Sequence, residues 1–205
     1  MPRREPGARP GTWLSTRDLL RRWWRPALVV LAAALAVVWR LVKDDLGAPP
    51  NLELSTAAAF LAAGLLRHRV AALVPLAVVA ASDLLLGNSA VLAFTWSAWA
   101  VIGAASLLTR RSGAGWRRYV TAVGFGVGGT LFFYLWTNLG VWWLGRGSFY
   151  PAGVDGLVAS YVAGLPFLRP MLLGNLVLVP LAAGAVALVE RLERRAPAPA
   201  AAPAR

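Results

Sequence analysis

The sequence predicts an all-α integral membrane protein, a bundle of six transmembrane helices with a short helix at its outer face. Two observations lead to this fold class. Of the 205 residues, 58% are hydrophobic and only 15% are charged, so a single soluble core could not bury the apolar side chains. Six apolar runs also follow one another, and the basic residues gather in the segments between them.

The chain begins with a polar segment, residues 1–25, which we expect to be a basic cytoplasmic tail. Ser15 and Asp18 have the spacing of a capping box ahead of two leucines, which predicts a short amphipathic stretch at its end. Trp23 and Trp24 then have the character of interface anchors. A cleaved signal peptide is the alternative for the first apolar run, and the long basic segment before it argues against cleavage.

A six-span transmembrane domain is predicted over residues 26–190. A helix rises about 1.5 Å per residue, so crossing a hydrocarbon core of about 30 Å takes about 20 residues. The second run is short, and its crossing needs the residues from Asn51 onward. The predicted spans are residues 26–43, 55–66, 70–87, 90–109, 118–140 and 170–189.

Two further segments complete the predicted organisation. Val154–Phe167 is apolar but is interrupted by an acid, two glycines and a proline, so we expect a short helix that lies at or dips into the outer face. Residues 191–205 are rich in alanine and proline and are predicted to form a disordered tail. The chain is therefore one membrane domain with a polar segment at each end.

The distribution of charge predicts that both termini are cytoplasmic. With six spans, every Lys and Arg except Arg40, Lys43, Arg146 and Arg169 falls on the side of the termini. Acidic residues outnumber the basic ones on the opposite side. Because cytoplasmic connections carry the excess of Lys and Arg, we expect a multi-pass protein of the inner (cytoplasmic) membrane with both ends inside.

The residue types exclude several classes of function. The chain has no cysteine and one histidine, His68, so we expect no metal, no cofactor and no catalysis by cysteine or histidine. No nucleophile–base pair or pair of catalytic carboxylates is evident, so no catalytic residue is predicted and the protein is not expected to be an enzyme. The net charge of +12 is explained by topology, and no nucleic acid is expected as a partner.

Two stretches of small residues are candidates for close helix packing. Gly124–Gly129 matches the dinucleotide pattern G-x-G-x-x-G, but no strand precedes it, so we interpret Gly124 and Gly128 as a packing face. Ala32 and Ala36 form a second face, on the first span. This face predicts the docking of a partner membrane protein, with packing inside the bundle as the alternative.

The segment Phe132–Trp143 indicates a ligand site, because it places an amide, a hydroxyl and three tryptophans at the end of an apolar run. Asp83 lies at the same, outer, end of another run, where the alternative is a solvated interfacial carboxylate. The outer loop Asp44–Glu53 would close over such a site, or is a stiff connection without a role. The predicted substrate-binding residues are Asn51, Glu53, Asp83, Trp136, Thr137, Asn138, Trp142, Trp143, Tyr150, Asp155 and Tyr161.

Five segments resemble a family of uncharacterised bacterial membrane proteins assigned to transport. The resemblance rests on P-P-N-L-E-L-S-T-A-A-A-F-L-A-A-G (49–64), V-P-L-A-V-V-A-A-S-D-L-L-L-G (74–87), F-F-Y-L-W-T-N-L-G-V-W (132–142), Y-P-A-G-V-D-G-L (150–157) and Y-V-A-G-L-P-F (161–167). That family is similar in turn to the substrate-binding, or S, components of energy-coupling factor transporters. The long arginine-rich tail and the Asn-Leu-Glu-Leu run depart from it.

The resemblance implies a substrate-binding subunit of a micronutrient uptake transporter. Such a six-helix bundle captures a small molecule at the outer face and works with a transmembrane coupling protein and cytoplasmic ATPases. The small residues Ala32 and Ala36 match the pattern by which S components dock on that coupling protein. The alternative is a stand-alone membrane scaffold or regulatory protein without a transported ligand. Beyond the lipid bilayer, the expected partners are therefore the ligand and the coupling module.

Overall fold

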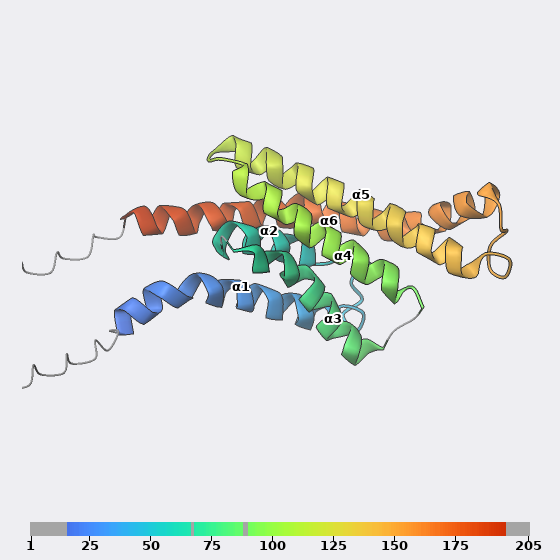
Figure 1. The fold of residues 1–205 in the computed structure, drawn as a ribbon, viewed down its shortest axis with the longest axis horizontal. Coiled ribbons are helices and arrows are strands. Elements are labelled where there is room, and N and C mark those ends of the chain that lie inside the picture. Colours follow the sequence, from blue (N-terminus) through green and yellow to red (C-terminus); the bar gives the residue numbers. More distant parts are fainter. Residues whose placement is uncertain (1–15, 67, 88–89, 196–205) are drawn as a thin grey trace, which may run out of the picture.

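The computed structural model describes residues 16–66, 68–87 and 90–195, and within these ranges every regular element is a helix (Figure 1). This confirms the predicted all-α class. The elements are α1 (Thr16–Val42), α2 (Ser55–Leu66), the 3-10 helix η1 (Arg69–Leu73), α3 (Val74–Leu86), α4 (Leu92–Ser106), the 3-10 helix η2 (Leu107–Arg111), α5 (Trp116–Gly145) and α6 (Val154–Arg195).

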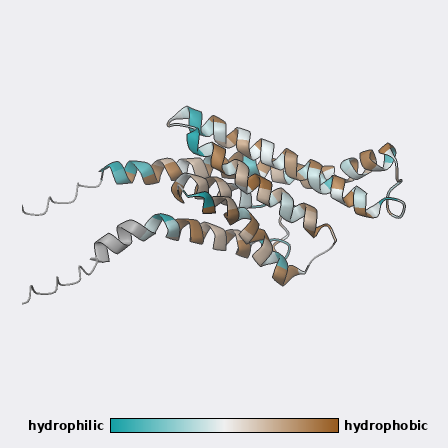
Figure 2. Cartoon of the chain, viewed as in Figure 1, coloured by the Kyte–Doolittle hydropathy of each residue, from teal (hydrophilic) through white to brown (hydrophobic). Residues whose placement is uncertain are grey.

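Five helical segments among the described residues are long and apolar enough to cross a membrane. They are Trp23–Val42, Arg69–Leu86, Leu92–Arg111, Trp116–Gly145 and Val154–Arg195. Many of their large apolar residues are exposed, and Figure 2 shows hydrophobic residues along the length of the helices. Apolar surface of this extent indicates a lipid bilayer environment, because water would not favour it. The membrane character predicted from composition is therefore supported, with five candidate spans rather than six.

The short run at residues 55–66 forms α2, which is the centre of the bundle. It has 12 residues, or about 18 Å of helix, which is less than the thickness of a hydrocarbon core. Most of its residues are buried, and it contacts all five other α-helices. A helix surrounded by protein in this way is apolar on all sides because no side of it faces water.

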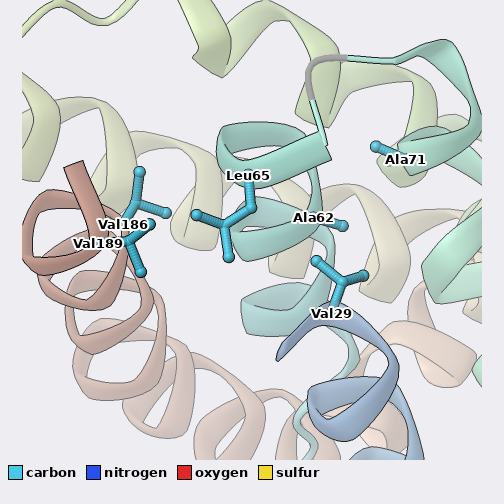
Figure 3. Packing of buried hydrophobic residues seen from close by; sticks show 6 residues of the cluster. All are labelled: Val29, Ala62, Leu65, Ala71, Val186 and Val189. Carbon is cyan, nitrogen blue, oxygen red and sulfur yellow. The ribbon is translucent and has the colours of Figure 1, made fainter. Parts of the chain in front are cut away.

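The helices alternate in direction, and α1 begins at the same end of the bundle at which α6 ends (Figure 1). We call this the terminal end and the opposite one the distal end. At the terminal end, Val29 of α1, Leu65 of α2 and Val186 of α6 belong to one buried apolar cluster (Figure 3). The other buried members of that cluster are Ala62, Ala71 and Val189. The distal ends of α1 and α3 are joined by an ion pair between Arg40 and Asp83.

The helices α1 and α6 both extend into the segments predicted as tails. Residues 16–25 are the first turns of α1, which continues without a break into the predicted first span. Likewise, α6 continues through Arg195, where the sequence predicts the disordered tail to begin at 191. Ser15 and the remaining tail residues, 1–15 and 196–205, lie outside the described residues.

Two long helices, α5 and α6, form an antiparallel pair that extends past the other helices at the distal end (Figure 1). Their 30 and 42 residues correspond to about 45 Å and 63 Å of helix. The short helix predicted at 154–167 and the span predicted at 170–189 are one continuous helix, so this separation is wrong. The glycines that suggested a break are packing points: Gly156 lies on the Pro151 backbone and Gly164 on the Asn138 side chain.

One glycine of α4 sets the approach of this helix to η1. A Cβ atom added at Gly103 would lie 1.9 Å from the carbonyl oxygen of Ala72, which is fixed backbone. We expect Gly103→Ala to lower the free energy of unfolding by between about 2 and 3 kcal/mol, measured by denaturant titration in detergent micelles. The control is Gly128→Ala, which meets open space and should raise it by about 0.5 kcal/mol. Equal stability of both variants would contradict this close approach.

Candidate functional site

Asp83 occupies the last turn of α3 and is buried between three helices. Its Oδ1 accepts a hydrogen bond from Nη2 of Arg40 on α1 at 2.7 Å, and its Oδ2 accepts one from Nε1 of Trp96 on α4 at 2.9 Å. Arg40 also donates from Nε to Oγ of Ser82 at 2.6 Å. The Asp83 carboxyl is therefore matched by a cation and an indole N–H, which allows its burial in an apolar bundle.

A second buried polar group surrounds Glu53, which lies just before α2. Its Oε2 accepts from the backbone N–H of Thr56 at 2.9 Å, so it caps the start of this helix. Its Oε1 accepts from the Thr56 hydroxyl at 2.6 Å and from Nδ2 of Asn175 on α6 at 2.9 Å. The same Nδ2 donates to Oγ1 of Thr130, at the middle of α5, at 3.0 Å. We call Glu53, Thr56, Thr130 and Asn175 the Glu53 network.

The Glu53 network is buried, but within the described residues not all of its polar atoms have a hydrogen-bond partner. Its four members have exposed fractions between 0% and 6%. Among the described residues, the Oδ1 atom of Asn175 and the hydroxyl of the neighbouring Ser55 have no hydrogen-bond partner. Buried polar groups are usually paired, so orphaned atoms of this kind mark a place where a water molecule or a ligand group would complete the site.

A cavity of about 30 Å³ lies between the Glu53 network and the Arg40–Asp83 pair. It is lined by Arg40, Lys43, Asn51, Leu52, Glu53, Trp99, Phe133 and Met171. Trp99 is 1% exposed, and its indole N–H has no acceptor among the described residues. The loop over the cavity is held by a hydrogen bond from Nε1 of Trp39 to the Leu52 carbonyl at 2.8 Å. This volume fits about two water molecules.

Part of the predicted ligand set meets at this cavity. Asn51 and Glu53 line it, and Asp83 is one side chain away, through Arg40. Asn51 is held with a positive φ of 59°, an uncommon conformation that asparagine tolerates better than most residues. The structure therefore places these three residues together, at the distal ends of α1 and α3 and the start of α2.

The predicted α5 residues lie elsewhere and bind their own helix or its neighbours. Thr137 donates to the Phe133 carbonyl at 2.7 Å and Asn138 donates to the Tyr134 carbonyl at 2.8 Å, one turn back in both cases. Trp136 donates from Nε1 to the Ser97 hydroxyl of α4 at 2.8 Å. Of these three contacts, the Trp136 bond joins α5 to α4 and the other two lie within α5, so none of them brings Asn138 to Asp83.

The remaining aromatic and acidic residues of the predicted set lie in the distal part of the α5–α6 pair. Trp142 donates from Nε1 to the Pro151 carbonyl at 3.0 Å, and Trp143 lies under the Arg146 guanidinium, 3.6 Å from the ring centre. The Tyr161 carbonyl accepts from the Tyr134 hydroxyl at 2.6 Å. Tyr150 closes the turn after α5 through its carbonyl, which accepts from Gly147 N–H, and Asp155 is exposed in the first turn of α6.

The two small-residue faces have different surroundings from those expected. Ala36 is fully buried within the chain and Ala32 is half-buried, which corresponds to packing inside the bundle at Ala36. On α5, a Cβ atom added at Gly124 or Gly128 would meet no atom within 4 Å. Within residues 124–129, the closest approach is at Gly126, whose Cβ position would lie 3.1 Å from the Asn175 carbonyl oxygen.

Sequence reasoning missed several residues of this site, namely Arg40, Trp99, Thr130 and Asn175. Asn175 had a usable signal, because it is an amide within the otherwise apolar run M-L-L-G-N-L-V-L-V. Arg40 lies near the end of a span, where a basic residue is expected at the interface in any case. Within the described residues, no three Asp, Glu, His or Cys side chains are grouped as metal ligands.

Comparison with known proteins places the chain in one family. A family model described as a family of unknown function, DUF6580, matches residues 18–199. No curated protein and no solved structure matches the chain. Because the family match covers most of the sequence, the chain belongs to the DUF6580 family.

Proposed function

We propose that this member of the DUF6580 family is a substrate-binding membrane subunit of a micronutrient uptake transporter. Its ligand would be a small molecule captured at the cavity between α1, α4, α5, α6 and the loop before α2. A transmembrane coupling protein with cytoplasmic ATPases would carry out the energised step, as the resemblance of the sequence to S components implies.

The observation that carries the proposal is the set of buried groups around the cavity. Trp99 offers an indole N–H that has no acceptor within residues 16–66, 68–87 and 90–195, and Arg40 and Lys43 add two cations. Glu53 lies on the same cavity and is backed by Asn175, whose amide oxygen has no donor in that part of the chain. A site that is mostly apolar, with a few convergent polar groups, is typical of small-molecule binding. The unpaired indole favours a ligand that carries a carboxylate or carbonyl oxygen.

The small volume of the cavity has a direct consequence for this proposal. About 30 Å³ admits no vitamin or amino acid, so binding requires the loop at residues 44–54 to move. Such a movement would break the hydrogen bond from Trp39 of α1 to the Leu52 carbonyl and the one from Asn175 of α6 to Glu53. We therefore assign the structure to a closed conformation in which the loop covers the site.

The same small volume favours the alternative, a membrane scaffold or regulatory protein without a transported ligand. In that case, the buried polar groups specify how the helices pack, and the cavity holds only water. The two functions differ in one measurable property. A ligand that binds the native state stabilises it, by about 2.7 kcal/mol at a concentration one hundred times Kd, and a scaffold shows no such stabilisation.

The experiment is a thermal-shift screen of the purified full-length protein against vitamins, nucleobase precursors and amino acids. We expect at least one compound with a carboxylate or carbonyl group to raise the unfolding temperature. Lys43→Gln should weaken that compound about tenfold, because a charge-assisted contact to the ligand is lost. The control Arg117→Gln removes an exposed charge far from the cavity and should leave affinity unchanged. No stabilising compound, or equal loss in both variants, would contradict the proposal.

The proposed topology has six crossings, with α2 as the short one. The supporting observations are the alternating directions of the helices and the common end at which α1 begins and α6 ends (Figure 1). The residues from Asn51 to α2 would complete the second crossing, and the terminal end, with its many arginines, would face the cytoplasm. The distal part of the α5–α6 pair, including Val154–Phe167, would then lie at the outer face of the inner membrane.

This topology predicts the location of both termini. A cytoplasm-active reporter fused after Arg205 should be active, and a reporter that requires export should be inactive at the same position. A fusion in the loop between α5 and α6, after Gly147, should give the opposite pair of results. Activity of the exported reporter at the C-terminus would contradict an even number of crossings.

A further inference from the structure

We propose that the terminal end of the bundle holds a specific binding site for one anionic phospholipid. The site has two compartments, a polar cavity lined by arginines and an apolar groove between α4 and α5. Neither compartment contributes to the proposed ligand site, which lies at the distal ends of α1 and α3. The inference is therefore independent of the proposed function.

The polar compartment is a cavity of about 270 Å³ enclosed by α2, η2, α5 and α6. Its polar lining consists of Arg110, Arg118, Thr109, Ser112 and Glu190. Two guanidinium groups face one carboxyl group, so the lining carries an excess of positive charge. Hydroxyl and guanidinium groups donate hydrogen bonds to phosphate oxygens, so such a lining accommodates a phosphate group.

Both arginines are held in place by hydrogen bonds that use only some of their N–H donors. Arg118 is buried and bonds Glu190 through Nη2 at 2.8 Å. Arg110 donates from Nε to the Ala63 carbonyl at 3.1 Å and from Nη2 to the His68 carbonyl. Each guanidinium has five N–H donors, so several remain for an anion after these bonds. A preorganised pair of this kind loses little side-chain entropy on binding.

The apolar compartment is a groove of about 440 Å³ between α4 and α5. Gly124 and Gly128 line it, and a Cβ atom added at either position would meet no described atom within 4 Å. It extends along α5 from Thr121 to Phe132, which is about 16 Å of helix. Its lining is predominantly apolar, so the groove suits a hydrocarbon chain and not a polar molecule.

The two compartments meet, which is why a single amphiphile fits both. Thr109 lines the cavity and the groove alike. Phe60 of the cavity also contacts Phe125 of the groove, with ring centres 6.0 Å apart. Trp116 and Tyr119, both exposed at the start of α5, mark this level as the membrane interface, where lipid headgroups lie. The phosphate would therefore lie in the cavity and one acyl chain in the groove.

The test counts lipids bound to the purified full-length protein by native mass spectrometry, with dioleoylphosphatidylglycerol or dioleoylphosphatidylcholine added to the micelles. We expect one phosphatidylglycerol per chain and at least tenfold weaker retention of phosphatidylcholine. Arg110→Gln and Gly128→Leu should each weaken phosphatidylglycerol about tenfold, the first by removing headgroup contacts and the second by filling the groove. Because Gly128 meets open space, its variant tests the site even if Arg110→Gln fails to fold.

The matched controls are Arg111→Gln and Ala100→Leu, exposed positions next to the cavity and on α4 that line neither compartment. Both should keep wild-type retention. If Arg111→Gln weakened phosphatidylglycerol retention as much as Arg110→Gln, the lipid would be attracted to the charged surface in general, and the proposed site would be overturned. The proposed site would also be overturned if phosphatidylcholine bound as tightly as phosphatidylglycerol, or if Gly128→Leu had no effect. The same holds if glycerol phosphate, which has no acyl chains, bound as tightly as phosphatidylglycerol.

Discussion

Arg40→Leu is expected to lower the free energy of unfolding by about 4 kcal/mol, one of the two largest effects of any single substitution proposed for this chain. Removing the guanidinium leaves the Asp83 carboxyl buried with only Trp96 as a partner, and the Ser82 hydroxyl loses the donor at 2.6 Å. Breaking one side of a buried ion pair costs about 3 to 5 kcal/mol, because the remaining charge has no solvent. Denaturant titration in detergent micelles measures the change.

Two further variants separate a buried ion pair from a surface one. Arg40→Leu combined with Asp83→Leu should recover about half of the loss, because no uncompensated charge remains and only the Trp96 donor is unpaired. Lys43→Gln breaks the pair with exposed Asp44 and should change stability by less than about 1 kcal/mol. A loss in the double variant as large as the sum of the single losses would show that the two residues act separately.

The fold could be predicted from the sequence wherever hydropathy alone determines the secondary structure. Apolar runs and the basic connections between them predicted an all-α membrane protein, and the predicted limits 26–43, 70–87, 90–109 and 118–140 lie close to four candidate spans. The errors concern α1 and α6, where helix continues through polar or proline-containing sequence. Pro166, Pro170 and Pro180 all lie inside α6. In a membrane, neighbouring helices compensate for the backbone bonds that prolines remove, so prolines and glycines there do not define helix ends.

The candidate site could be predicted from the sequence only in part, because its residues come from segments that are far apart in the chain. The sequence indicates Asp83 because an ionisable group at membrane depth needs a partner, and Asn51 and Glu53 because they lie in the outer loop that would close over a site. Asp83 pairs with Arg40 and Glu53 with Asn175, which in turn bonds Thr130; these residues are distant in sequence, and nothing in the composition shows which helix faces which. Asn138 had the same signal as Asn175. The structure separates the two, because Asn138 bonds its own helix and packs on Gly164.

The Glu53 network gives the second of the two largest expected effects. Glu53→Leu should lower the free energy of unfolding by about 4 kcal/mol, because three donors lose their acceptor in a buried site: the Thr56 N–H, the Thr56 hydroxyl and the Asn175 amide. Glu53→Gln should cost less, about 2 kcal/mol. Its amide keeps one oxygen for Thr56 and Asn175, but its NH₂ group then faces the Thr56 N–H, and two donors cannot pair.

The order of these losses distinguishes a hydrogen-bonded network from simple packing. Asp44→Asn, an exposed carboxyl in the same loop, should be nearly silent, within about 0.5 kcal/mol. Glu53→Leu combined with Asn175→Leu should cost less than the sum of the single variants, because each single change leaves the other residue unpaired. Additive losses, or Glu53→Gln as harmful as Glu53→Leu, would mean that Glu53 is held by shape alone. The buried amide of Asn175 would then have no part in orienting a ligand.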